Sequence, residues 1–198
     1  MDKAILPACY LPPIPYFSCI LKNAGSGILI EQYEHYPKQT YRSRASIYGA
    51  NGKLDLIIPV KKGNRDHTRM KDVRISYDAD WQRLHWLSLQ TAYRSSAYFE
   101  FYEDDFARFY ERQYPFLLEY NLELTRMILS FLKIDTVLSP TDSYQAVYPV
   151  GILDMRDKIH PKIPIESDLP PYRQVFSDRH GFIAGLSIVD LLFNHGPQ

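Results

Sequence analysis

The most constraining feature of this sequence is a change of hydrophobic period near Trp81. Upstream of it, apolar side chains form short runs or alternate with polar ones, which is typical of strands. Downstream, they recur every three or four residues, which is typical of helices. Because no linker separates the two halves, we expect one α+β domain over residues 1–198. In it, a mixed sheet from the first half packs against the helices of residues 81–133.

Three segments of the first half predict strands of that sheet. Residues 27–33 are apolar on both faces at their start, which indicates a strand in the interior of a sheet. Residues 41–48 and 53–60 flank Asn51-Gly52, a dipeptide that tolerates the positive φ angles of a type I′ turn. These two segments therefore predict a β-hairpin.

Five helices are expected, of which the three central ones form the group that covers the sheet. Asp80 can cap the first central helix, on which Trp81, Leu84 and Leu87 share a face. The other two central helices follow Ser96 and Pro115, and the last is apolar almost all round, which indicates burial. Shorter helices are expected at 16–24 and 186–193.

Prolines break every candidate element between residues 135 and 172. A long proline-rich connection of this kind usually lies on the surface or acts as a lid or arm. We therefore expect an irregular arm before the short final helix.

The charges of the chain cancel, since 23 Lys and Arg residues balance 23 Asp and Glu residues. Their distribution is uneven. Residues 1–75 carry 12 basic and 6 acidic residues, a balance of +6, and the remainder carries the compensating −6. The basic half could face an anionic ligand or be a solvated surface. No duplex-binding motif accompanies it, so we expect no nucleic-acid partner.

The N-terminal sequence and the two cysteines bear on location and redox chemistry. No apolar run reaches the roughly 18–20 residues that span a bilayer, so no transmembrane segment is expected. Pro7, Pro12 and Pro13 interrupt the place where a signal peptide would be apolar, which favours a cytoplasmic location. Cys9 and Cys19 have no metal-binding or redox spacing, so we expect them to pack in the interior.

The familiar catalytic signatures are absent from the sequence. It has no GxxxxGK[ST] or GxGxxG phosphate loop, no GxSxG elbow and no HExxH pair. The six histidines are scattered without ligand spacing, so no metal site is expected. The sequence identifies no cofactor.

Four residues at the start of the hairpin could bind an anion. They are Lys38, Tyr41, Arg42 and Arg44. Alternate residues of a strand share a face, so Arg42 and Arg44 would form a pair suited to a carboxylate or a phosphate. The alternative is that they form the polar outer face of the sheet.

Two further groups place polar side chains beside aromatic ones. His85 follows Trp81 by one helical turn, so its ring could reach a cleft beside an aromatic wall, or it could simply pack on the tryptophan. Near the C-terminus, Gln174 and His180 belong to a segment rich in side-chain donors that precedes the last helix.

The C-terminal stretch of residues 172–197, YRQVFSDRHGFIAGLSIVDLLFNHGP, resembles the end of the WbqC-like family. Collinear matches precede it: Tyr10-Leu11-Pro12-Pro13, an acidic strand end at Glu31, Tyr41-Arg42-Ser43-Arg44, Leu56-Ile57-Ile58-Pro59-Val60, and Trp81 with His85. The chain is thus similar to a short form of this family over nearly its whole length. It lacks an extra α/β segment that longer members carry between positions corresponding to residues 135 and 172.

The resemblance implies a role in O-antigen or surface-polysaccharide biosynthesis, with an acyl or aminoacyl (glycine-type) transferase acting on activated sugars as the first hypothesis. The ligand would be a nucleotide-sugar or another anionic small molecule. Its binding residues would be Lys38, Tyr41, Arg42, Arg44, Gln174 and His180. His85 would be the general base, and Glu31 would orient it or the acceptor.

The second hypothesis is a non-catalytic binding or assembly protein whose arm at residues 135–172 contacts a partner, and a homo-oligomer is left open. One observation separates the two hypotheses. The enzyme is favoured if Arg42, Arg44, His85 and His180 line one concave pocket, and the binding protein is favoured if they scatter.

Overall fold

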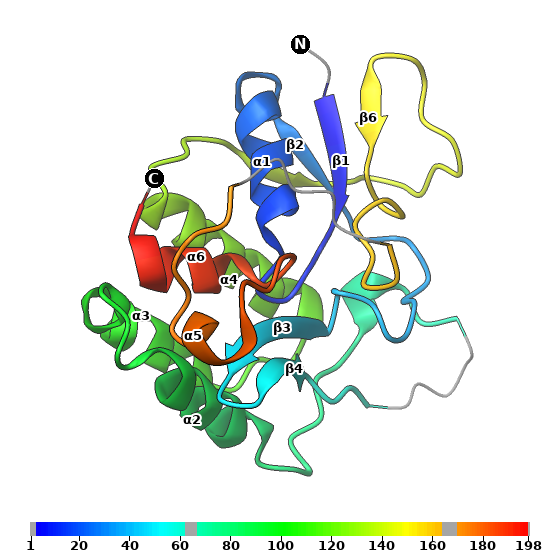
Figure 1. The fold of residues 1–198 in the computed structure, drawn as a ribbon. Coiled ribbons are helices and arrows are strands. Elements are labelled where there is room, and N and C mark those ends of the chain that lie inside the picture. The colour runs from blue at the N-terminus through cyan, green and yellow to red at the C-terminus, as the bar shows by residue number, and fades with distance from the viewer. Residues whose placement is uncertain (1–2, 62–66, 164–169, 198) are drawn as a thin grey trace.

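The computed structural model describes residues 3–61, 67–163 and 170–197, and its strands form two separate sheets (Figure 1). The first is a four-stranded parallel sheet of β1 (Lys3–Pro7), β2 (Ile28–Glu31), β5 (Leu138–Pro140) and β6 (Ile152–Asp154) in the order β5-β2-β1-β6. The second is an antiparallel hairpin of β3 (Arg44–Gly49) and β4 (Gly52–Ile57).

The order of the parallel strands determines where a ligand could bind. From β1 the chain passes through a helix to β2 and then to β5, and it returns on the other side of β1 as β6. In sheets of this kind, ligands bind outside the carboxyl ends of the strands, at the point where the order reverses. Here that point lies at the carboxyl ends of β1 and β6.

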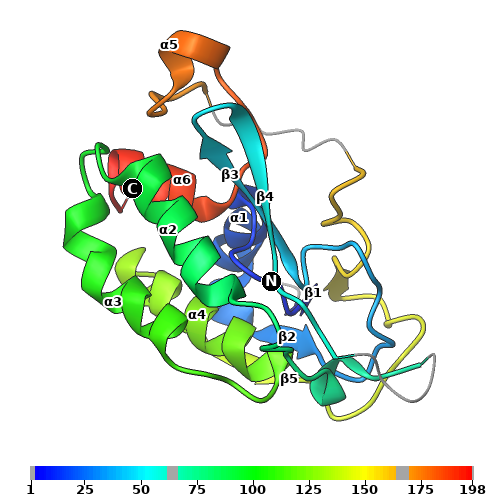
Figure 2. The same ribbon diagram turned by 90° about the horizontal axis from the view of Figure 1, so that it is seen from below.

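The central strand β1 is enclosed on both faces, since Ala4, Ile5 and Leu6 have no exposed surface. A continuous apolar run is typical of a parallel strand in this situation. The helices are α1 (Ile14–Asn23), α2 (Trp81–Tyr93), α3 (Phe99–Glu111), α4 (Leu117–Phe131), α5 (Ser177–His180) and α6 (Ile188–His195), with short 3₁₀ turns at Ala24–Ser26 and Met70–Asp72. Figure 2 shows α2, α3, α4 and α6 together on one side of the strands.

The C-terminal segment covers the start of α1. The backbone N–H of Ile188 donates to the carbonyl of Pro12 at 2.9 Å, and Ser187 forms a bridge with Pro13. The N–H of Ser187 also donates to the carbonyl of Ser46 in β3 at 2.8 Å. The proline-rich start of the chain, the hairpin and the last helix are therefore joined at one place.

A buried carboxylate anchors the segment before α6. Asp190 accepts hydrogen bonds from the hydroxyls of Tyr93 (2.8 Å) and Tyr172 (2.6 Å) and from Nε2 of Gln174 (2.8 Å). Burial raises the pKa of Asp190, whereas these three donors act in the opposite direction. Asp190 therefore joins the segment around Tyr172 to its own helix, α6, and through Tyr93 to α2.

The α+β class expected from the sequence is confirmed, as are the five expected helices. The hairpin is also confirmed, but its turn differs from the expected type. Gly49 pairs with Gly52, and of the turn residues only Gly52 has a positive φ, at 100°. A type I′ turn needs two residues with positive φ, so the turn is of another type.

Parallel pairing occurs in the four-stranded sheet and antiparallel pairing in the hairpin. Two of the four parallel strands come from the second half of the chain. The strands β5 and β6 lie inside the segment that was expected to be an irregular arm, of which residues 164–169 are outside the described residues. The expected face of α2 is also wrong in part. Trp81 is buried, but Leu84 and Leu87 are about half exposed, and Asp80 pairs with Arg83 instead of capping the helix.

Candidate functional site

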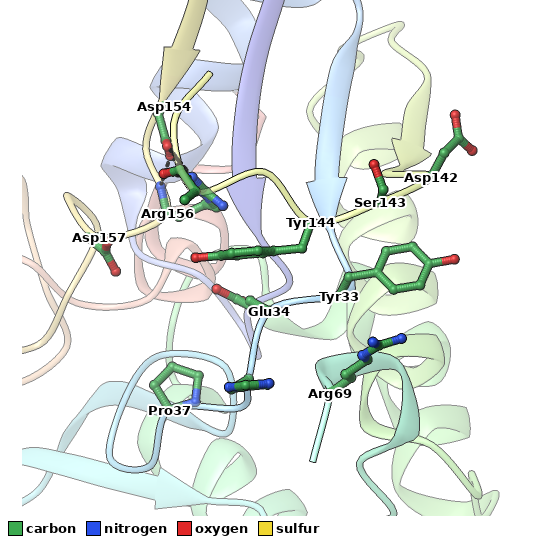
Figure 3. Close-up of a pocket in the computed structure, with 12 residues that line it drawn as sticks. Tyr33, Glu34, Pro37, Arg69, Asp142, Ser143, Tyr144, Asp154, Arg156 and Asp157 are labelled. Carbon is green, nitrogen blue, oxygen red and sulfur yellow. Dashed lines mark hydrogen bonds and ion pairs between the residues drawn. The ribbon is translucent and has the colours of Figure 1, made fainter. Parts of the chain in front are cut away.

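A polar pocket opens at the carboxyl edge of the parallel sheet, and we call it the carboxyl-edge pocket (Figure 3). Its walls come from the segments that follow β2, β5 and β6, together with Arg69. Its volume of about 750 Å³ lies in the range of ~300–1,000 Å³ that small-molecule sites occupy. The lining residues are Tyr33, Glu34, His35, Pro37, Arg69, Asp142, Ser143, Tyr144, Ala146, Asp154, Arg156 and Asp157.

Glu31 joins the three segments behind this lining. Its carboxylate accepts hydrogen bonds from the backbone N–H of Tyr33 (2.7 Å), from Oγ1 of Thr141 (3.1 Å) and from Nη1 of Arg156 (3.4 Å). The side chain is fully buried, so it touches no space that a ligand could enter. These contacts fit a residue that positions the pocket wall.

Arg156 fixes the wall that follows β5. Its guanidinium contacts the carboxylate of Asp154 at 2.5 Å, and its Nη1 donates to the carbonyl of Gln145 at 2.9 Å. It also lies over the rings of Tyr148 and Tyr144, at 4.9 and 5.4 Å from their centroids. Burial raises the pKa of Asp154, but the hydrogen bonds from Arg156 outweigh it and the net pKa lies below the usual value.

Glu34 is the lining carboxylate whose surroundings favour proton transfer. Its two oxygens accept from Nε and Nη2 of Arg42, at 2.5 and 2.7 Å, in a bidentate pair. Burial raises the pKa of Glu34 although Arg42 opposes this shift. A lining acid with a raised pKa can accept a proton from a bound molecule and return it.

The four residues predicted to bind an anion do not form one site. Arg42 lies in the turn before β3, so the prediction that it shares a strand face with Arg44 is wrong. Arg44 lies 3.6 Å from Asp55 in the neighbouring strand. Tyr41 is buried, where desolvation raises its pKa to about 12, and Lys38 is exposed. Of the four, Arg42 reaches the carboxyl-edge pocket indirectly, through Glu34.

His85 lies between α2 and the hairpin and is not part of the pocket lining. Its Nδ1 is 3.0 Å from the hydroxyl of Tyr10, and its ring packs against Trp81 with centroids 5.1 Å apart. Desolvation lowers its pKa to about 4, although a hydrogen bond to the backbone of Ile57 acts in the opposite direction. The expected contact between the imidazole and Trp81 is present, whereas the expected proximity to Glu31 is not among its contacts.

The two C-terminal candidates also lie elsewhere. Gln174 is buried against Asp190 and receives the backbone N–H of Ile183 at its Oε1, at 2.9 Å. His180 is exposed, and its Nε2 is 2.9 Å from the carbonyl of Ala50 at the hairpin turn. Arg42, Arg44, His85 and His180 therefore do not line the carboxyl-edge pocket together, which counts against an enzyme built on these four residues and favours the binding protein.

Sequence reasoning missed most of the pocket residues, including Glu34, Arg69, Tyr144, Asp154 and Arg156. One signal was available, because Glu34 follows closely after a strand that the sequence did predict. Polar residues just beyond an interior parallel strand commonly face a ligand. The other strand ends were concealed within the proline-rich segment.

The residues that the structure describes also bear on membrane insertion and metal binding. None of their helices is long and apolar enough to cross a bilayer. No group of three or more His, Cys, Asp or Glu side chains among them is arranged to hold a metal ion.

These features define an α+β protein in which buried ion pairs surround a pocket at the carboxyl edge of a parallel sheet. The chain belongs to the WbqC-like protein family, whose sequence profile matches residues 8–149. It is 26% identical over 220 residues to a Mycobacterium tuberculosis (strain ATCC 25618 / H37Rv) protein described as "Uncharacterized protein Rv1507c", covering 98% of this chain and 94% of that protein. No solved structure matches at a significant level.

Proposed function

We propose that the protein binds an activated sugar in the carboxyl-edge pocket and transfers an acyl or aminoacyl group to it. The observation that carries this proposal is the Glu34–Arg42 pair at the pocket surface, an acid of raised pKa held in a fixed orientation. Aromatic and charged side chains share the lining, and polar groups beside aromatic ones can fix the orientation of a bound small molecule. A role in surface-polysaccharide biosynthesis, which the family resemblance implies, supports the choice of a sugar.

The reaction assigns a base to Glu34 and a supporting role to Arg42. Glu34 accepts the proton of an amine or hydroxyl on the sugar while that atom bonds to the carbonyl carbon of an acyl donor, a thioester or an acyl phosphate. The bond between that carbon and the leaving group breaks. A thiolate leaving group takes the proton from Glu34, and when the leaving group is phosphate Glu34 releases the proton to solvent. Arg42 holds the carboxylate toward the pocket. Glu34 is favoured over His85 as the base because it lines the pocket.

Binding and transfer can be tested with one matched pair of variants. Ligand-observed NMR with a panel of nucleotide-sugars should detect binding to the wild type, and incubation with thioester donors should add an acyl mass to the sugar. The Glu34→Gln variant should retain binding and lose roughly 10²–10⁴-fold in rate, as removal of a general base does. Glu103→Gln is the control, since Glu103 also pairs with an arginine, Arg94, but outside the pocket. Absence of binding to any nucleotide-sugar at millimolar concentration would refute the proposal.

The second candidate function is a non-catalytic assembly role, and one observation favours it. Val147 and Val150, in the connection between β5 and β6, expose their side chains almost completely. Exposed apolar side chains can mark a surface that contacts a partner. Val147→Ser with Val150→Ser should then change the oligomeric state measured by light scattering while nucleotide-sugar binding persists. A monomer in both proteins would argue against self-assembly through these residues.

A further inference from the structure

We propose that Arg69 and Lys71, both held against the ring of Tyr33, form a phosphate subsite at one end of the carboxyl-edge pocket. This inference rests on the proposed function and refines it, because it says which part of an activated sugar binds where. The phosphate or diphosphate would contact Arg69 and Lys71. The sugar would extend toward Glu34.

The usual phosphate position in such a sheet is blocked. Phosphates commonly bind the backbone N–H groups at the start of the helix that follows the first strand. Here the N-cap of α1 is Pro13 and its second residue is Pro15, and proline has no N–H to offer. The C-terminal segment also covers this place, through the bond from Ile188 to Pro12. A phosphate must therefore be bound by side chains of another element.

Two arginines at the pocket are already paired with carboxylates. Arg42 is held by Glu34, and Arg156 is held by Asp154. A ligand could use either of these buried guanidinium groups only by displacing its carboxylate, which would cost several kcal/mol. Arg44 is the first residue of β3, pairs with Asp55 and does not line the pocket.

Arg69 and Lys71 differ in this respect. Arg69 lines the pocket, whereas Lys71 does not line it and adjoins it through the ring of Tyr33. Within the residues that the structure describes, neither lies within ion-pair distance of a carboxylate, and both lie near Tyr33, at 5.7 and 4.9 Å from its ring centroid. Two like charges at one ring repel one another, and an anion bound between them would relieve that repulsion. A guanidinium can donate two parallel hydrogen bonds to a phosphate, and an ammonium adds a point charge.

Backbone hydrogen bonds fix these cations relative to the proposed base. The N–H of Met70 donates to the carbonyl of Glu34 at 2.9 Å, and the N–H of Lys71 donates to the carbonyl of Gln32 at 3.0 Å. The residue between the two cations is thus bonded directly to the backbone of the base. Figure 3 shows Arg69 beside Tyr33, across the cavity from Asp154.

Pyrophosphate alone is the probe that tests the subsite without assuming a sugar. Calorimetry at low ionic strength should show binding to the wild-type protein, and Arg69→Gln and Lys71→Gln should each weaken it about tenfold or more, as loss of a charged hydrogen bond does. Arg74→Gln is the matched control. Arg74 is an exposed cation of the same segment, but it lies over the ring of Phe116, at 5.0 Å, and not over that of Tyr33. The affinity of the Arg74→Gln variant for pyrophosphate should stay within about twofold of that of the wild type.

Every outcome separates this inference from the proposed function. If pyrophosphate does not bind, or if Arg74→Gln weakens it as much as Arg69→Gln does, the subsite is refuted. If nucleotide-sugars bind but Arg69→Gln leaves their affinity unchanged, the subsite is likewise refuted while the proposed function stands. If pyrophosphate binds through Arg69 but no nucleotide-sugar binds, the subsite stands and the proposed function fails.

Discussion

The carboxyl-edge pocket and the interior between α2 and the hairpin both bury polar side chains, but at the pocket these form an ion pair and in the interior they do not. At the pocket, Arg42 and Glu34 are buried as a bidentate ion pair. In the interior, His85 meets the hydroxyl of Tyr10, which in turn lies 2.9 Å from the hydroxyl of Tyr110. Desolvation keeps that interior group neutral at physiological pH, since it lowers the pKa of His85 and raises that of Tyr10.

This difference shows that burial alone does not mark a functional site. Desolvation acts on both regions, and it raises the pKa of Glu34 and lowers that of His85. The two groups differ in whether a charged partner opposes this effect. The guanidinium of Arg42 opposes the rise in the pKa of Glu34, whereas His85 lies among neutral rings and its pKa falls to about 4.

The largest expected effect comes from breaking the ion pair at the pocket. Arg42→Met leaves Glu34 buried without its partner, and it should lower the free energy of unfolding by about 3–5 kcal/mol. The measurement is urea denaturation at neutral pH. The double variant with Glu34→Gln should recover part of that loss, because it also removes the unpaired acid. A single-variant loss below about 1 kcal/mol would mean that the pair is not buried as described.

Lowering the pH should reduce the free energy of unfolding through His85, whose buried imidazole is neutral. The pKa of His85 is about 4 in the folded protein and about 6.5 when unfolded, so between these values the unfolded chain binds more protons. This group therefore makes stability fall as pH drops from about 6.5 to about 4, by up to about 3 kcal/mol. Unfolding free energies of wild type and His85→Gln across this range isolate its contribution. Equal slopes in both proteins would contradict it.

Asp190 offers an intermediate case, an acid buried among neutral donors. Asp190→Asn replaces an acceptor of three hydrogen bonds by an amide that cannot accept them all, so a loss of about 2 kcal/mol is expected. Hydrogen exchange should accelerate near Tyr172 and Gln174, which the acid anchors. Tyr172→Phe removes one of the donors and should cost about half as much. An Asn variant as stable as wild type would refute the anchoring role.

The smallest effect is expected at an ion pair that faces solvent. Arg44 and Asp55 lie 3.6 Å apart, with 25% and 36% of their side chains exposed. Pairs of this kind contribute roughly 0.2–1 kcal/mol. Arg44→Gln should therefore change the midpoint of urea denaturation only slightly. A loss as large as that of Arg42→Met would show that exposure does not separate the two arginines.

The elements that sequence reasoning predicted are those long enough to show a period. The helix at Leu117–Phe131 repeats its apolar positions over four turns, and the hairpin has a turn signal between two runs. The strands β5 and β6 have three residues each, which is too few for any periodicity to appear. Their pairing with β1 and β2 is decided by contacts far apart in the chain.

The site was predicted less well than the fold for a related reason. Glu31 was found because it ends a recognisable strand, and Arg42 because it belongs to a motif. Glu34 and Arg156 lie in irregular segments, where spacing does not say which way a side chain points. Both residues line one pocket because β2 and β6 are parallel strands of one sheet, and the sequence did not reveal that both strands belong to it.

The pairing of Lys3 with Ile152 has a consequence for the time course of folding. Ribosomes add roughly 5–20 residues per second, so the first strand waits about 7–30 s for its partner on one side. The start of α1 waits longer still, until Ile188 is made. During that interval the apolar N-terminal stretch has an unpaired edge, which is the state that chaperones bind and from which aggregates grow. The parallel sheet can therefore be completed only after Ile152 has been made, and the cover over the start of α1 only after Ile188 has been made.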